Sequence, residues 1–173
     1  MLLKPQDILF LLKLIAIGNK SWSFNKLAIE LSMSPSEVHA ASNRVLEARL
    51  AVRKDKTIIP NIRNLEEFLI HGLKYVFVPK RGEMTRGIPT SYAAPPLESF
   101  FVPDNEPLPV WPDPEGDVRG MSFSPLYKSA PKAARSDVEL YELLVLVDAI
   151  RGGRAREIDF GVKELKMRLH AYD

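Results

Sequence analysis

The sequence predicts a mainly α protein with a small β hairpin, an α+β fold, on three observations. Apolar residues recur at helical spacing near both ends of the 173-residue chain. Between them, "AVRKDKTIIP" (51–60) places two short apolar runs around a charged tip, which is typical of a hairpin. Eleven of the 14 prolines then fall between Pro79 and Pro131, and proline excludes regular helix from that stretch. The predicted regions are therefore 1–64, 65–135 and 136–173.

The first region, residues 1–64, is predicted to contain three helices followed by the hairpin. Pro5 suits the first turn of a helix that ends at Gly18. Ser23 is placed to cap a short second helix. Ser34 opens the third helix, with Glu37 three residues later, and this S-x-x-E pattern is a capping box.

The middle region, residues 65–135, is predicted to begin with a linking helix that Asn64 caps. A strand, "KYVFV" (74–78), follows, and then a Pro-rich segment, residues 79–135, which we call the strap. The strap holds large apolar residues such as Phe101 and Trp111, too many for a flexible linker. We therefore expect an ordered, extended segment packed against the rest of the protein, with room only for short edge strands.

The third region, residues 136–173, is predicted to form a pair of helices. Ser136 precedes "DVELYELLVLVDAI", a helix that is apolar nearly all the way round. Such a helix must be surrounded by protein, either as the centre of this chain or in a dimer interface. A final amphipathic helix is expected over 155–170. This region is the predicted dimerisation or partner module.

Composition excludes several classes of site. The chain has no cysteine, which rules out disulfides and thiolate chemistry and fits a reducing cytoplasm. The three histidines lie far apart without the spacing of metal ligands, and no phosphate-binding loop or nucleophile elbow is present. Charged residues interrupt every apolar run, so we expect no signal peptide and no membrane span. We expect a cytoplasmic protein that is not an enzyme, with no catalytic residues, metal or cofactor.

Positive charge is concentrated in the first region. Residues 1–64 contain ten Lys or Arg against five Asp or Glu, whereas the whole chain has a net charge of only +2. A local basic surface is what the phosphate backbone of nucleic acid selects, although a basic surface without a partner would give the same pattern.

The third helix, 35–48, has one apolar and one polar face. Val38, Ala41 and Val45 are spaced to hold it against a core. The order of helices and hairpin is that of a winged helix-turn-helix, in which such a helix reads the major groove and the hairpin, or wing, contacts phosphates. Polar and small side chains that suit base edges or phosphates occur along the helix and on the wing, 51–59. The candidate DNA-binding residues are Ser34, Ser36, His39, Ala40, Asn43, Arg44, Arg53, Lys54 and Lys56.

The segment "NKLAIELSMSPSEVHAASNRVLEARLAVRKD" resembles the recognition segment of winged-helix regulators of the MarR-like class. In that class S-x-x-x-V is followed by R-[LV]-x-E-A-x-L, and Ser34, Val38 and Arg44 match these positions. Arg49 replaces the usual glycine, and Ser42 stands where an apolar residue is usual. The resemblance covers about the first third of the chain. It implies a sequence-specific transcriptional regulator that binds double-stranded DNA, often as a homodimer.

A second function fits the same sequence. Winged helices also serve as protein–protein platforms, so the chain could instead be an interaction subunit, antitoxin-like or defence-associated, that holds a second protein. Within the strap, "GEMTRGIPTSYAAPP" carries polar side chains in a stiff backbone that loses little entropy on docking. Thr85, Arg86 and Tyr92 are its candidate partner or effector residues.

Overall fold

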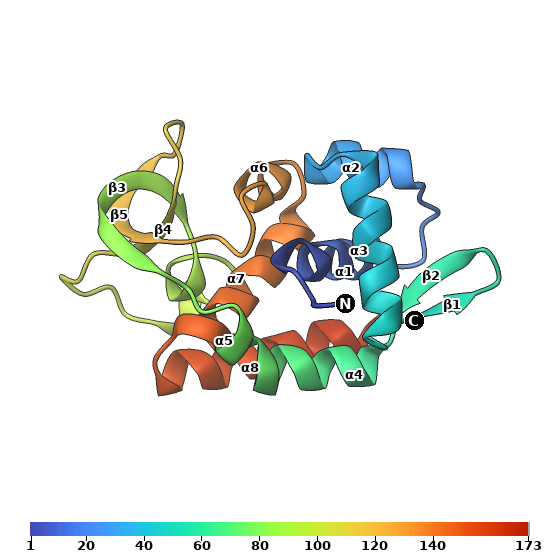
Figure 1. The fold of residues 1–173 in the computed structure, drawn as a ribbon. Helices are drawn as coiled ribbons and strands as arrows, with labels where there is room; N and C mark the ends of the chain where they lie inside the picture. Colours follow the sequence, from blue (N-terminus) through green and yellow to red (C-terminus); the bar gives the residue numbers. More distant parts are fainter. Residues whose placement is uncertain (173) are drawn as a thin grey trace.

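Three helices and a hairpin form the amino-terminal part of the computed structural model, which describes residues 1–172 (Figure 1). The hairpin and the three-stranded unit of the strap lie at opposite ends of the molecule in Figure 1. The amino-terminal elements are α1 (Pro5–Ile17), α2 (Phe24–Leu31), α3 (Pro35–Glu47), β1 (Ala51–Lys54) and β2 (Thr57–Pro60).

Local capping signals set the starts of these helices, and the predicted caps are confirmed. The Ser23 hydroxyl accepts a hydrogen bond of 3.2 Å from the Lys26 amide. At the start of α3, the Ser34 hydroxyl accepts a hydrogen bond of 3.2 Å from the Glu37 amide. In return, the Glu37 carboxylate accepts one of 2.7 Å from the Ser34 amide. This reciprocal pair satisfies two donors that a helix start would otherwise leave free.

The helix after the hairpin differs from the prediction at both ends. It begins at Ile62 with Asn61 as its cap, and it runs as α4 (Ile62–Glu67), a π turn (Phe68–Gly72) and α5 (Leu73–Val76). The predicted strand over 74–78 is therefore wrong: residues 74–76 are helical, and 77–78 belong to no strand. Leu65, Leu69 and Leu73 are fully buried at intervals of four residues, and this packing outweighs the local strand preference.

The strap folds back into three short strands. They are β3 (Arg81–Pro89), β4 (Pro109–Pro112) and β5 (Val118–Phe123). β3 is antiparallel to both others, and β4 and β5 pair in parallel over two residue pairs, so each strand borders the other two. Gly87 permits this closeness, because a Cβ there would lie 1.9 Å from the Trp111 carbonyl oxygen. The strap is thus more regular than the extended segment that its prolines predicted.

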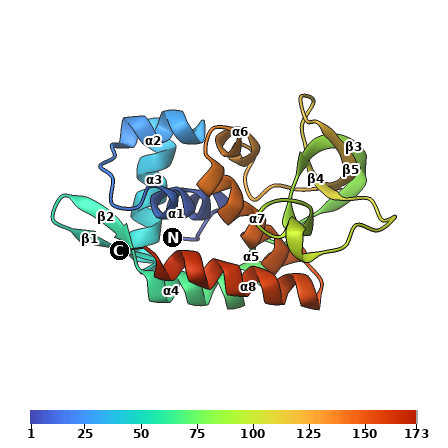
Figure 2. The ribbon, with the colours of Figure 1, turned by 180° about the vertical axis from the view of Figure 1, so that it is seen from behind.

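The carboxy-terminal helices are α6 (Ala130–Arg135), α7 (Val138–Gly152) and α8 (Ala155–His170). Asp137, not Ser136, caps α7: its carboxylate accepts a hydrogen bond of 3.0 Å from the Leu140 amide. Residues 143–150 are all buried, and α7 packs on α1, α5, α6 and α8 of the same chain. Of the two alternatives left by the sequence, α7 is the central helix of the chain. Figure 2 shows α8 along the opposite side from α3, beside α4.

A buried polar network fastens the strap to α7. Asp148 accepts hydrogen bonds from Thr90 at 2.6 Å, from the Trp111 indole at 2.7 Å and from Arg151 at 2.9 Å. Arg151 also donates to the carbonyls of Phe77 and Ser124. Burial raises the pKa of Asp148, and Arg151 with these hydrogen bonds opposes the rise. Each charged group has partners, so the network is structural.

One apolar core unites the amino- and carboxy-terminal helices in an α+β fold. Buried residues of α1, α3, α7 and α8 belong to a single cluster that also includes Trp111 and Phe123 of the strap. Lys13 of α1, 5% exposed, binds Asp137 at 2.6 Å and Glu30 at 3.2 Å. In residues 1–172, no helix has both the length and the apolar character of a membrane span.

Candidate nucleic-acid interface

The two faces of α3 differ as its sequence pattern predicts. Val38, Ala41 and Val45 are fully buried, and α3 packs on α1 and α2. On the other face Ser36, His39 and Asn43 are exposed and Ala40 is half-buried. These residues, three and four positions apart, form one stripe along the helix, which we call the α3 stripe (Ser36, His39, Ala40 and Asn43).

Neighbouring groups hold the α3 stripe in place. The His39 ring stacks on Phe24, the first residue of α2, with centroids 3.9 Å apart and an interplanar angle of 21°. Trp22 meets Phe24 edge-on at 5.3 Å and so supports it from behind. Ser42, 2% exposed, donates to the His39 carbonyl at 2.7 Å, which satisfies its hydroxyl inside the core. The stripe is therefore presented on a rigid helix with His39 in a fixed orientation.

Arg44 is a correction to the predicted DNA-binding set. Its guanidinium donates two hydrogen bonds of 2.7 Å to the carboxylate of Asp7, and the two residues are 9% and 0% exposed. Hydrogen bonding to Asp7 raises the pKa of Arg44 above its ordinary value. Arg44 lies on the core side of α3 because this carboxylate, at the start of α1, needs a cation. It is not available to DNA.

The amino-terminal end of α3 carries a contact that the sequence did not predict. The Tyr127 hydroxyl, from the loop before α6, donates to Glu37 at 2.9 Å. The Ser34 amide and this hydroxyl lower the pKa of Glu37, so the carboxylate keeps its charge. Ser34 and Ser36, both predicted site residues, lie here with their hydroxyl oxygens 3.0 Å apart. Ser34 thus acts as the helix cap and is also exposed.

The hairpin places three basic side chains at one end of the molecule. Arg53, Lys54 and Lys56 are exposed, and within residues 1–172 none of them forms an ion pair. The tip turns at Asp55 with φ 54°, a left-handed conformation that aspartate tolerates. A groove of about 450 Å³ lies between the hairpin and residues 22–24, and Arg53 and Lys56 line it. The hairpin therefore offers unpaired positive charge beside the start of α2.

Arg49 follows α3 with φ 61°, in the left-handed region that favours glycine. The MarR-like pattern has glycine at this position, whereas this chain adopts the left-handed conformation with an arginine. The cost of the left-handed conformation is roughly 1–2 kcal/mol for a residue with a Cβ.

The three candidate partner residues of the strap do not form one site. Thr85 and Arg86 lie on β3, where they pair with Gly120 and Arg119 of β5. Tyr92 lies in a 3₁₀ turn against Phe101, with ring centroids 5.9 Å apart. Burial raises the pKa of Tyr92, and the cavity beside it, about 190 Å³, is lined by neither Thr85 nor Arg86.

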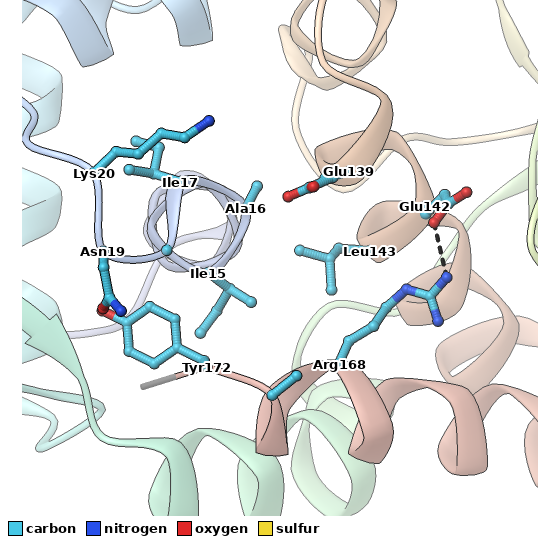
Figure 3. Close-up of a pocket in the computed structure, with 12 residues that line it drawn as sticks. Ile15, Ala16, Ile17, Asn19, Lys20, Glu139, Glu142, Leu143, Arg168 and Tyr172 are labelled. Carbon is cyan, nitrogen blue, oxygen red and sulfur yellow. Dashed lines mark hydrogen bonds and ion pairs between the residues drawn. The ribbon is translucent and has the colours of Figure 1, made fainter.

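A groove that no sequence pattern indicates lies where α1, α7 and α8 meet. It has a volume of about 440 Å³, and Figure 3 shows Lys20 on the α1 side with Glu139 on α7. Glu142 binds Arg168 at 2.8 Å at its edge. Its charged groups can bind a small polar molecule, but it contains no serine, cysteine or histidine that could act as a nucleophile. Its lining residues come from three separate segments, 15–20, 139–143 and 168–172, and the first two are more than 110 positions apart, so no local motif could indicate it.

Two further findings bear on function. Within residues 1–172, no group of three or more His, Asp or Glu side chains is arranged to hold a metal ion. Comparisons of the chain with protein-family models, with curated proteins and with solved structures found no match.

Proposed function

We propose that this protein is a sequence-specific DNA-binding transcriptional regulator whose residues 1–64 form a winged helix-turn-helix. In this proposal α3 enters the major groove and the hairpin acts as the wing. The observation that carries the proposal is the α3 stripe, a row of polar and small side chains, three of them exposed, on a helix whose opposite face is fully buried. The unpaired Arg53, Lys54 and Lys56 supply the charge for backbone contact.

Each group in the α3 stripe has a chemistry that fits a base edge. Asn43 can donate to and accept from the edge of adenine, and His39 can donate or accept along its exposed ring edge. Ala40 is small and lets the helix approach the groove closely. Because Arg44 is turned inward, direct guanine contact by this residue is not part of the proposal. Selectivity then rests on His39 and Asn43.

The proposal also includes a homodimer. A twofold pair of α3 helices spaced by one turn of duplex, about 34–36 Å, would read a palindromic site. Light scattering of the protein with and without duplex measures this stoichiometry directly.

The test starts by selecting binding sites from a random 30-base-pair duplex library. The selected and a scrambled duplex are then titrated across a salt series. His39→Ala/Asn43→Ala should lose roughly 1–3 kcal/mol of selectivity per lost base contact. Arg53→Ala/Lys54→Ala should weaken binding to both duplexes and lower the salt slope by about 1.8, because each phosphate contact contributes about 0.9. Lys163→Ala/Lys166→Ala, exposed lysines of α8, is the charge-matched control.

A second candidate function is that of a protein-interaction subunit, and one observation favours it. Tyr75, Val76 and Val78 are 75%, 53% and 65% exposed, and they are close together in sequence after the π turn. A contiguous exposed apolar patch is typical of a protein contact. If no duplex is selected, and the protein alone forms assemblies larger than a dimer that Tyr75→Ser/Val78→Ser abolishes, this second function replaces the first.

A further inference from the structure

The loop that ends at α6 approaches the amino-terminal end of α3, although more than 80 residues separate the two in sequence. Leu126 and Ala130, on either side of this loop, are 5% and 0% exposed. Tyr127 is half-buried and donates to Glu37 at 2.9 Å. One hydrogen bond therefore ties the loop to α3, and a buried residue on each side of Tyr127 anchors the loop in the core.

Lys128 is the exposed residue of this fixed loop. Its Nζ lies 5.8 Å from the centroid of the Tyr127 ring, and its positive charge helps to lower the pKa of Glu37. Within residues 1–172 it forms no ion pair. By contrast Arg135, at the end of α6, is bound to Asp113 and Glu115 at 2.9 Å each and carries no free charge.

We propose that Lys128 binds a backbone phosphate of duplex DNA at the amino-terminal end of α3, opposite the wing. This inference rests on the proposed function. The wing follows the carboxy-terminal end of α3, so it supplies cations on that side only. The other end of α3 carries the negative charge of Glu37, which would repel a phosphate. Lys128 offsets that charge and adds a cation from outside the first 64 residues.

The geometry also assigns Tyr127 as a positioning residue. A lysine on a free loop would lose conformational entropy on binding, whereas the Tyr127–Glu37 hydrogen bond places Lys128 before DNA arrives. The DNA-binding surface therefore includes a residue from the second half of the chain. A chain cut after residue 64 would lack this contact.

Salt-dependent binding of the full chain to the selected and scrambled duplexes tests the inference. Lys128→Gln should lower the salt slope by about 0.9 on both duplexes and leave their affinity ratio unchanged. The same slope predicts an affinity about fivefold lower at 0.15 M salt, since the contribution vanishes near 1 M. Tyr127→Phe keeps the charge and should keep the slope, but it should weaken binding of both duplexes. Lys163→Gln, on α8, is the matched control and should change neither quantity.

The outcomes separate this inference from the function on which it rests. An unchanged slope in Lys128→Gln, together with lost selectivity in His39→Ala/Asn43→Ala, would overturn the Lys128 contact and keep the regulator. Indifference of binding to all of these variants would overturn both. Thermal melting checks that each variant is folded. Because Lys128 is exposed, Lys128→Gln should have the melting temperature of the wild type.

Discussion

Replacing Arg44 with methionine removes two of the three donors that hold the carboxylate of Asp7. The lost hydrogen bonds are 2.7 Å each, and Asp7 is 0% exposed, so water cannot take their place. Breaking a buried ion pair by removing one partner costs about 3–5 kcal/mol. Asp7 keeps the Lys4 amide, at 2.8 Å, and its place in the first turn of α1, so we expect the lower end, about 3 kcal/mol.

For a chain of 173 residues, that loss lowers the melting temperature by about 6–12 °C. Guanidinium denaturation of Arg44→Met and of wild type at equal pH measures the loss in the free energy of unfolding, and a thermal melt measures the shift in melting temperature. The double variant Asp7→Leu/Arg44→Met leaves no buried charge unpaired. It should regain all but about 1 kcal/mol, the cost of the lost cap at Lys4.

Two results would refute this reasoning. A melting temperature within about 2 °C of wild type would show that the pair is not buried in solution. Preserved stability with lost selectivity for the selected duplex would show that Arg44 faces DNA, as the spacing along α3 alone predicts.

Four further predictions follow from single contacts. Asp148→Ala leaves Arg151 buried without its carboxylate and should cost about 3–5 kcal/mol in denaturant unfolding; a cost below about 1 kcal/mol would contradict the buried network. The lowered pKa of Glu37 contributes stability that is present above pH 4.5 and is lost as the pH falls through the folded-state pKa, so Glu37→Gln should narrow the stability difference between neutral and acidic buffer. Burial raises the pKa of Tyr141 to about 12, so stability should fall as the pH rises from 10 toward 12, and an equal fall in Tyr141→Phe would refute this assignment. Arg49→Gly relieves the left-handed backbone at φ 61° and should raise the free energy of unfolding by about 0.5–1 kcal/mol, whereas a decrease would show that the arginine side chain stabilises this turn.

The helices with strong local signals were predictable from the sequence. Pro5, Ser34 and Glu37 all act within the first turn of the helix that they start, so the sequence alone locates α1 and α3. The β-forming residues of 74–78 predict a strand, but buried Leu73 continues the helix from Leu65 through residue 76. The parallel pairing of β4 with β5 depends on contacts between segments without any local pattern.

The candidate site was predictable only where one helix determines it. The spacing of Val38, Ala41 and Val45 established which face of α3 is buried. Arg44 was misplaced because its partner, Asp7, lies 37 residues earlier and no pattern within α3 indicates it. The sequence alone does not place Lys128 beside α3, because that position depends on a hydrogen bond between residues 90 positions apart.

The contact between Lys13 and Asp137 has a consequence for the order of events during synthesis. The two residues are 124 positions apart, and α1 packs on α7. At 5–20 residues per second, a ribosome needs roughly 6–25 s to make the intervening chain. Throughout that time the apolar face of α1 that α7 will cover has no native partner. The nascent chain is therefore a candidate client for chaperones that shield apolar helices, and slower translation should increase its aggregation.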